Sequence, residues 1–400
     1  VISNGKDKVV RDLKNEMKKC DKLWLASDFD REGESIGWHV QNVLRVPSEK
    51  TKRIIFTEIT KKAIQEAVKN PTHLDINMFY SQQARRVLDR IIGYLISPIL
   101  WNQIQSSYKE KKSLSAGRVQ SVVVKLIIER ENIISDFESK PYYKTQGTFE
   151  LPLSKKKNLT LEAEFNKDID KRNTLEKLYN IWKINKFFIS DIKTKNTTRK
   201  PPQPFITSTL QQEASSKLGI SPKETMSIAQ KLYENGHITY MRTDSLALSD
   251  EALADIKKKV IKEFGEDYYQ ETKYKSKDKN SQEAHEACRP CKFSKHTLEK
   301  LENISYRENR LYKLIWTRTM MSQMKSAKVE ITNIKIGFKD DNGKENKNHF
   351  VSKKEFIVFE GFLKANNIYK KNNEDEELED DNEKEEVEIL EKDGKKILEK

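Results

Sequence analysis

The chain has 400 residues, of which 34% are charged, with a formal net charge of +13 and a mean hydropathy of −0.81. This length predicts two to four domains of roughly 100 to 200 residues each. No apolar run approaches the roughly 18 residues that cross a bilayer. The best run, 122–128, is broken by Lys125, so membrane insertion is excluded. The basic balance predicts a polyanionic partner.

Charge is unevenly distributed along the chain. Residues 374–388 hold eleven acidic residues and one lysine, a net charge of −10, which leaves +23 on the rest. The composition of 370–388 predicts a disordered acidic loop. The N-terminal residues lack the apolar core and cleavage pattern of a secretion signal. Because the chain starts with Val1 rather than Met, we expect a fragment, from which an upstream targeting peptide could have been lost.

Three cysteines occur, Cys20, Cys288 and Cys291, and this odd number does not suggest a disulfide framework. A reducing compartment fits such a count. Cys288 and Cys291 form a C-x-x-C pair that could ligate zinc together with His285 and His296, but the second pair that makes zinc spacing convincing is missing. Zinc therefore remains the weaker interpretation.

Helical and strand periodicities alternate over the first 74 residues, which predicts a small α/β unit. The expected elements are a helix over 9–17, a strand over 22–27, a helix over 34–44, a strand over 53–56, and a helix capped by Thr60 that ends before Asn70-Pro71. From 75 to 138 the pattern is helical, with a segment over 76–101 that is kinked or ended at Pro98 and another over 118–132.

Strand alternation then returns over 142–150 and 158–165, with Leu159, Leu161, Ala163 and Phe165 expected on the buried face. A further strand is expected over 187–192, before the stiff break at 201–204. Helices are expected after that break, with starts at Pro222 and Ser249 and another over 307–324; the first of these ends at Asn235-Gly236. Strands over 327–338 and 350–359 then complete the sheet, so an inserted helical domain interrupts a β-rich domain.

An unusual acidic segment, Asp-Phe-Asp-Arg-Glu-Gly-Glu at 28–34, directly follows the apolar run 23–26. Carboxylates this close repel one another and stay ionised only beside a cation. Hard oxygen ligands at the end of a strand suit Mg²⁺, and a metal that also meets phosphate is the functional interpretation. Gly33 would let the chain turn sharply into the next helix. The alternative is a solvated acidic turn.

A second candidate site centres on Tyr240, which follows the helix end at Gly236, so its hydroxyl could be exposed. A phenol with a pKa near 10 is a poor nucleophile, but Arg242 could neutralise the phosphate that it attacks. Gln230 and Glu234 lie one helical turn apart and share a face that could point at the same site. The alternative is that Tyr240 packs in the interior and Arg242 is a surface cation.

Two further segments could contact phosphate. Residues 115–121 combine small side chains, which allow close backbone approach, with Arg118 at the start of a helix whose N–H groups favour an anion. Tight helix packing explains the small residues equally well. His285 could serve the phosphate or a leaving group, although a surface histidine is the simpler interpretation.

These segments together resemble the type IA DNA topoisomerases, and among them bacterial topoisomerase I. The matching motifs, in the same order, are D-x-D-R-E-G-E of the Toprim fold at 28–34, Q-Q-A-R-R-x-x-D-R within 81–101, S-A-G-R-V-Q-S at 115–121, I-T-Y-M-R-T-D-S at 238–245 and H-E-A-x-R-P at 285–290. Ser121, Met241 and Glu286 favour topoisomerase I over topoisomerase III. The resemblance covers essentially the whole chain.

The resemblance implies a multidomain α/β and α+β fold. It divides the chain into a Toprim α/β domain at 1–74, a helical DNA-binding domain at 75–138, a β-rich hinge domain at 139–201 and 326–400, and an inserted helical domain at 202–325 that carries the catalytic tyrosine. It also implies an ATP-independent isomerase that relaxes negatively supercoiled DNA through single-strand cleavage, a 5′-phosphotyrosine link, strand passage and religation. The substrate would be single-stranded or underwound DNA, and the protein would be a monomer.

The resemblance also assigns roles to individual residues. Tyr240 would be the nucleophile, with Arg242, Arg31 and His285 beside the phosphate, and Asp28, Asp30 and Glu32 would hold Mg²⁺. The residues that would contact DNA or line the site are Arg85, Arg86, Asp89, Tyr94, Trp101, Ser115, Ala116, Gly117, Arg118, Val119, Gln120, Gln230, Glu234, Thr239 and Asp244. Stacking on aromatic rings and salt-sensitive arginine contacts suit single strands.

The chain departs from the family in two respects. The strand with a glutamate and a lysine that begins the family's Toprim fold is absent, and so is the family's C-terminal region, so the chain as given is expected to lack full activity. Cys288 replaces an aliphatic residue. Two alternatives follow: a Mg²⁺-dependent Toprim nuclease, or a cleavage-deficient fragment that binds single-stranded DNA. The expected location is the cytoplasm, with the nucleoid in a bacterium, or a DNA-containing organelle.

Overall fold

The computed structural model describes residues 5–105, 114–154, 157–274, 286–299, 301, 303–340 and 343–371. The chain forms two compact units, one built from Val1–Glu138 with Gln230–Tyr240 and the other from Ser139–Ala229 with Met241–Lys400. Each unit is described separately. The finer division into four domains stays a prediction. No helix in the described ranges has both the length and the apolar character needed to span a bilayer.

The first unit begins with the predicted α/β arrangement. Its elements are α1 (Asp7–Met17), β1 (Leu23–Leu25), α2 (Arg31–Leu44), a 3-10 turn (Ser48–Lys50), β2 (Thr51–Arg53) and α3 (Lys61–Lys69). β1 and β2 pair in parallel, with Leu23 opposite Thr51. β2 begins two residues before the predicted strand and ends at Arg53, although the Ile54 N–H still donates to the Leu25 carbonyl oxygen at 3.0 Å. Thr60 caps α3 as predicted, since its side chain accepts a hydrogen bond from the Ala63 N–H.

Helix α2 starts at Arg31, three residues earlier than the sequence predicts. Asp30 is its N-cap, because the Oδ1 atom accepts a hydrogen bond of 2.7 Å from the Gly33 N–H. Gly33 therefore lies inside the helix, and the prediction of a sharp turn there was wrong. Glycine is required for close approach instead, since a Cβ at this position would lie 2.0 Å from the Asp28 carbonyl oxygen.

We expect Gly33→Ala to destabilise the first unit by about 1–3 kcal/mol, because the added methyl group must push the Asp28 backbone away. Urea unfolding of the chain measures this change. Gly93→Ala is the matched control, since Gly93 is also helical and its added Cβ would meet nothing closer than the Ala116 carbonyl oxygen at 3.6 Å. The control should be neutral or stabilising. Equal effects of the two substitutions would contradict the close-approach argument.

Two long helices follow, α4 (Ile76–Leu100) and α5 (Arg118–Ser135). Asp75 caps α4 by accepting hydrogen bonds from the N–H groups of Asn77 and Met78. Pro98 does not end α4, which runs on to Leu100 and into a π-helical turn over Trp101–Gln105. A proline cannot donate the usual helical hydrogen bond, and a wider turn directly after it accommodates the altered ladder.

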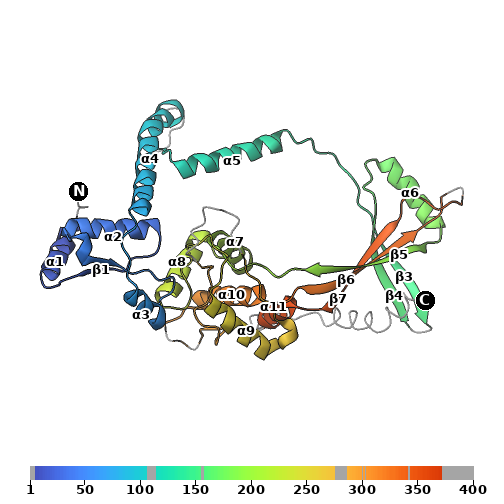
Figure 1. Ribbon diagram of the computed structural model, residues 1–400. Helices are drawn as coiled ribbons and strands as arrows, with labels where there is room; N and C mark the ends of the chain where they lie inside the picture. The colour runs from blue at the N-terminus through green and yellow to red at the C-terminus, as the bar shows by residue number, and fades with distance from the viewer. Residues whose placement is uncertain are drawn as a thin grey trace. The chain divides into compact units, whose positions relative to one another are not determined.

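The second unit contains a five-stranded antiparallel sheet of order β3-β4-β7-β6-β5 (Figure 1). The strands are β3 (Gln146–Ser154), β4 (Lys157–Phe165), β5 (Phe188–Arg199), β6 (Ala327–Gly337) and β7 (Phe350–Phe359). Strands from before and after the helical insertion pair directly, and Thr194 on β5 hydrogen-bonds Thr332 on β6 at 3.1 Å. The predicted interruption of a β-rich region by helices is confirmed.

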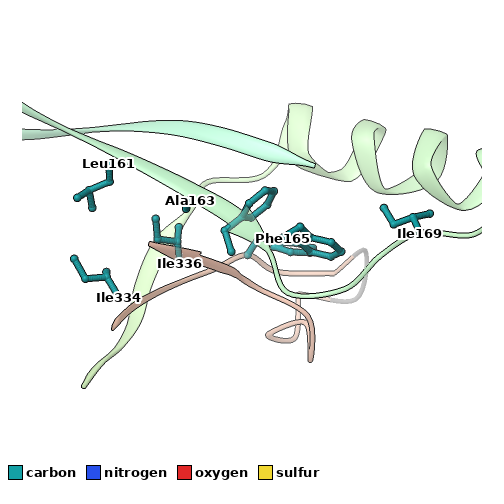
Figure 2. Close-up of a cluster of buried hydrophobic side chains, with 8 residues drawn as sticks. Leu161, Ala163, Phe165, Ile169, Ile334 and Ile336 are labelled. Atoms are coloured by element: carbon teal, nitrogen blue, oxygen red, sulfur yellow. The ribbon is translucent and has the colours of Figure 1, made fainter. Parts of the chain in front are cut away.

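The core of this sheet lies on the face that the alternation of 161–165 predicted, while the side chain of Leu159 lies outside the described part of the structure. Leu161, Ala163 and Phe165 of β4 are buried, and they lie against Ile334 and Ile336 of β6 (Figure 2). Helix α6 (Arg172–Ile184), which was not predicted, packs on the same cluster through one apolar face. The sheet and α6 thus share one core.

Two helices of the insertion begin where the sequence predicts, one at Pro222 and one directly after Ser249. The helices of the insertion are α7 (Thr207–Leu218), α8 (Pro222–Glu234), α9 (Asp250–Phe264) and α10 (Tyr306–Ser322), with a 3-10 turn at Glu266–Tyr268. Ser221 caps α8 and Ser249 caps α9, each through its side-chain oxygen. An unpredicted helix, α11 (Phe362–Lys371), follows β7. Most of the predicted acidic loop, from residue 372 onward, lies outside the described residues.

Candidate active site

Arg53 lies at the end of β2, is completely buried and contacts the acidic segment through hydrogen bonds. Its Nε donates to Glu34 Oε1 at 2.9 Å, and its other nitrogens donate to the carbonyl oxygens of Ser27 at 2.8 Å and Asp28 at 2.9 Å. Arg53 therefore supplies a cation to Glu34, one of the four crowded carboxylates, and fixes the backbone that leads into the acidic segment. No sequence motif marks Arg53 as a site residue, although its place beside the apolar run 54–56 is a visible signal.

Tyr240 lies at the same turn. Its hydroxyl donates a 2.5 Å hydrogen bond to Asp30 Oδ2, and its backbone N–H donates to the Thr57 carbonyl oxygen at 2.8 Å. The ring packs edge-on against Tyr233, with centroids 5.2 Å apart. Tyr240 is only 2% exposed, so the prediction of an exposed hydroxyl was wrong. Two segments 210 residues apart in sequence are thus joined in one compact unit.

The segment before Tyr240 approaches the loop after β2 closely. Gly236 has a φ of +71°, and a Cβ there would lie 2.5 Å from the Ile59 carbonyl oxygen. Gly236 ends α8 in the left-handed conformation, which glycine adopts without steric cost. This glycine therefore lets the chain turn from α8 into the strand-like segment that delivers Tyr240 to Asp30.

The two oxygen atoms of the Asp30 carboxylate accept hydrogen bonds from different elements. Oδ1 caps α2 and Oδ2 accepts the Tyr240 hydroxyl, so the acid is oriented by a helix terminus while it faces the phenol. A carboxylate in this position can orient the hydroxyl and accept its proton. Chemically, the pair is an oxygen nucleophile with an adjacent base.

The residues of the acidic segment fit a magnesium ion by the chemistry of their oxygen atoms. Carboxylates suit Mg²⁺, yet within the described ranges no group of three His, Cys, Asp or Glu side chains is placed to hold a metal ion. Asp28 is half-buried, whereas Arg31 and Glu32 are exposed on the first turn of α2. The assignment of Asp28, Asp30 and Glu32 as metal ligands stays a prediction.

The other residues predicted around Tyr240 are divided between the two compact units. Gln230 donates to Glu234 at 2.9 Å on the last turn of α8, and Thr239 is buried beside Tyr240 in sequence. Arg242 and Asp244 are exposed and belong to the second unit. His285 lies outside the described residues.

Around Arg242 and Asp244 the backbone is fixed by neighbouring side chains. The Thr207 hydroxyl is 2.8 Å from the Met241 carbonyl oxygen and 3.0 Å from that of Thr243, and the Thr243 N–H donates back to the hydroxyl oxygen. The alternation of buried Met241, Thr243 and Ser245 leaves the two charged side chains pointing outward.

Among the predicted DNA-binding residues on α4 and α5, some form ion pairs within the protein and others are exposed to solvent. Arg118 donates twice to Asp89, at 2.8 and 2.9 Å, so the charge of this arginine is already matched by a carboxylate. Arg85, Arg86 and Tyr94 are exposed, and the Arg90 guanidinium lies over the Tyr94 ring at 5.4 Å. A stacking surface with cations alongside it is available there.

Residues 114–120 are tied to α4. The Ala116 N–H donates to Ser97 Oγ at 3.0 Å, and the Trp101 indole N–H donates to the Leu114 carbonyl oxygen. The remaining predicted residues of this segment are Ser115, whose hydroxyl lies 3.5 Å from the Gln120 side chain, Gly117, the N-cap of α5, and the exposed Val119 and Gln120. Both interpretations of the small residues, tight packing and a phosphate contact, stay predictions.

The cysteine pair does not form a zinc site in the described part of the chain. Cys288 is fully buried, and burial raises the pKa of its thiol to about 12, whereas a zinc ligand must be a thiolate. The backbone of Cys288 bridges Phe205, and this places it in the interior of the second unit.

Thiol labelling of the native chain at pH 8 should modify the exposed Cys20 rapidly and leave Cys288 unmodified, because a buried, protonated thiol reacts poorly. Peptide mapping after iodoacetamide treatment provides the measurement. Unfolding in urea is the control and should make both thiols reactive. Rapid labelling of native Cys288 would contradict the burial described above.

Comparison with known proteins agrees with this arrangement. Residues 73–397 match the family described as DNA topoisomerase, and residues 2–59 match the Toprim domain. The chain belongs to the type IA DNA topoisomerase family. The fold class expected from the sequence is confirmed by the same matches and by a structural neighbour.

Three members of the family illustrate the similarity. The chain is 46% identical over 381 residues to a prokaryotic-type DNA topoisomerase 1 of Acanthamoeba polyphaga mimivirus, covering 90% of this chain and 44% of the relative. It is 42% identical over 338 residues to DNA topoisomerase 1 of Buchnera aphidicola, covering 84% and 38%. Full-length topoisomerase I of Thermotoga maritima superimposes with a TM-score of 0.74 at 38% identity, covering 91% and 58%. The chain thus spans less than half the length of the curated relatives.

Proposed function

We propose that the full-length protein cuts one strand of DNA with Tyr240, passes a second strand through the break and rejoins the first. It would thereby relax negatively supercoiled DNA without ATP. The observation that carries this proposal is the 2.5 Å hydrogen bond between the Tyr240 hydroxyl and Asp30 Oδ2. It pairs an oxygen nucleophile with a carboxylate of the Toprim acidic segment, and family membership supplies the substrate class.

The chemistry is a reversible transesterification. The Tyr240 oxygen attacks the phosphorus, its proton passes to Asp30, and the bond from phosphorus to the 3′ oxygen breaks. The departing 3′ oxygen takes up a proton, and the 5′ end remains linked to the tyrosine. Religation reverses each step, and the exchange of one phosphodiester for another explains why no ATP is needed.

Charge on the phosphate is neutralised in this proposal by Arg242, Arg31 and His285. Mg²⁺ is a further part of it, with Asp28, Asp30 and Glu32 as the residues that would hold the ion. The ion would supply additional neutralisation of phosphate charge. Relaxation by the full-length protein is then expected to stop when a chelator is added and to return with excess Mg²⁺.

The substrate strand in this proposal is single-stranded, and it follows α4. Exposed Arg85 and Arg86 would contact phosphates, while Tyr94 and Trp101, which are 70% and 43% exposed, would stack on bases. Such contacts carry no sequence readout and weaken with salt. We further propose that the protein acts as a monomer.

Denaturing electrophoresis tests the function directly. Full-length protein is mixed with end-labelled single-stranded DNA and quenched with detergent. A topoisomerase leaves protein attached to the 5′ end of the break and releases a free 3′ hydroxyl. A Toprim nuclease, which would use water in place of Tyr240, releases two free ends. Free ends without a protein adduct would overturn the proposal.

A second candidate applies to residues 1–400 on their own, namely binding of single-stranded DNA without cleavage. It is supported by the exposed Arg85, Arg86 and Tyr94 of α4, which offer cations and an aromatic ring to a single strand. Nicking of supercoiled plasmid, measured across a Mg²⁺ titration, distinguishes binding without cleavage from cleavage. Metal-dependent nicking by the 400-residue chain would rule this candidate out.

A further inference from the structure

A groove in the second unit is lined by none of the residues assigned to catalysis. It has a volume of about 840 Å³ and lies between β3 and α6, at one end of the five-stranded sheet. Figure 1 shows α6 over this part of the sheet. Its walls are rich in aromatic rings, including Tyr143, Phe149, Tyr179 and Trp182.

Some of these rings pack against one another, and others are exposed to solvent. Phe149 packs against Phe187 with centroids 5.0 Å apart and an interplanar angle of 72°, and Trp182 packs against Phe350 at 5.2 Å. Tyr179, in contrast, is 55% exposed. One wall of the groove is therefore rigid, and a flat ring that entered would meet an uncovered tyrosine on the other.

Gly147 helps to shape the floor. A Cβ at this position would come within 2.9 Å of the Phe149 ring, so glycine allows that ring to lie over the backbone of its own strand. Two polar atoms in the walls, Thr145 Oγ1 and Trp182 Nε1, have no hydrogen-bond partner in the described structure. Both atoms are buried beneath the groove surface, so a ligand in the groove would not reach them directly.

The segment of the chain that contributes β3 and α6 to the groove is basic. Residues 139–200 contain fifteen lysines and arginines against seven acidic residues, a net charge of +8. At the rim, the Lys183 ammonium lies 5.5 Å from the centre of the Tyr179 ring, and Arg172 pairs with Glu176 at 2.9 Å. An exposed aromatic ring with a cation beside it, in a positively charged region, is the combination that binds single-stranded nucleic acid.

We propose that this groove binds single-stranded DNA, with a base stacked on Tyr179 and a phosphate near Lys183. The contact goes beyond the proposed cleavage site, because it lies on the hinge sheet and uses none of the catalytic residues. It would give the protein a place to hold a strand other than the one attached to Tyr240. Stacking tolerates any base, so no sequence preference is expected.

Photocrosslinking tests the proposal on the 400-residue chain. A thymidine oligonucleotide with one 5-iododeoxyuridine is irradiated with the protein, and the crosslinked peptides are identified by mass spectrometry. Crosslinks are expected on peptides that contain residues 143–149 or 172–187. Tyr179→Ala should lower their yield by about tenfold, because a stacked base loses its partner. Lys183→Gln should lower it at low salt.

Tyr306→Ala is the matched control. Tyr306 is 72% exposed, and Arg310, four residues along the same helix, lies 5.5 Å from its ring, so it reproduces the Tyr179 and Lys183 pair outside the groove. Its substitution should leave the yield unchanged. The proposal is overturned if no crosslink maps to the groove, if the two tyrosine variants behave alike, or if thymidine monophosphate or polyglutamate competes as well as the oligonucleotide. Cleavage is not needed for the readout, so this test and that of the proposed function fail independently.

Discussion

The Tyr240→Phe variant of the full-length protein is expected to form no covalent complex with DNA. The substitution removes only the hydroxyl, so the ring can keep its packing on Tyr233 while the nucleophilic oxygen is lost. The hydrogen bond to Asp30 is lost as well, at a cost of about 1–3 kcal/mol in stability. Binding of single-stranded DNA should change little. Detergent-trapped complexes on labelled DNA measure capture, and fluorescence anisotropy measures binding.

Tyr233→Phe is the control for this experiment. Its ring lies 5.2 Å from that of Tyr240 and is equally buried, so the same chemical change is made one ring away from the proposed nucleophile. We expect this variant to retain capture. If Tyr240→Phe captured DNA at the wild-type level, Tyr240 would not be the nucleophile.

A second large effect is expected at Arg53. Arg53→Met should destabilise the first unit by about 3–5 kcal/mol, because it leaves the Glu34 carboxylate buried without its partner. The carbonyl oxygens of Ser27 and Asp28 would also lose their donor, and the backbone that carries Asp30 would be released. Urea unfolding followed by circular dichroism measures the change in the free energy of unfolding.

Two further variants define the cause. Arg53→Met combined with Glu34→Gln should recover part of the stability, since no isolated charge remains buried. Arg172→Met breaks the solvent-exposed pair with Glu176 and should cost no more than about 1 kcal/mol. Were Arg53→Met as mild as Arg172→Met, the Arg53 and Glu34 pair would not organise the acidic segment.

Local sequence chemistry predicted the starts of many elements. Thr60, Ser221 and Ser249 each have a short polar side chain that can cap a helix, and all three cap one. The alternation of Leu161, Ala163 and Phe165 likewise predicted a buried strand face, because successive side chains of a strand point to opposite faces. These features depend on neighbours within a few residues.

Features that depend on distant partners were missed or misjudged. Gly33 looked like a turn residue, but its role comes from the Asp28 carbonyl oxygen, which only the folded backbone brings to it. Arg53 pairs with a carboxylate nineteen residues earlier, and periodicity carries no information about such a contact. Tyr240 is buried where it contacts Asp30, a residue 210 positions away that no local pattern predicts as its partner.

Helix α6 is a different case, because its signal was present. Leu175, Leu178, Ile181 and Trp182 recur at helical spacing and all pack on the core of the sheet. This helical period is short and lies between two segments with strand alternation, which obscures it in a longer window. A window of thirteen residues treated separately would have identified the helix.

The central claim is that the Tyr240 oxygen attacks the DNA phosphate from its position beside Asp30. Mass spectrometry of the trapped complex tests it most directly. Full-length protein is quenched on single-stranded DNA, digested with nuclease and protease, and searched for a peptide that carries a nucleotide through its 5′ phosphate. The predicted adduct is on Tyr240, in the peptide that contains residues 238–242. An adduct on any other residue, or cleaved DNA with no adduct at all, would contradict the claim.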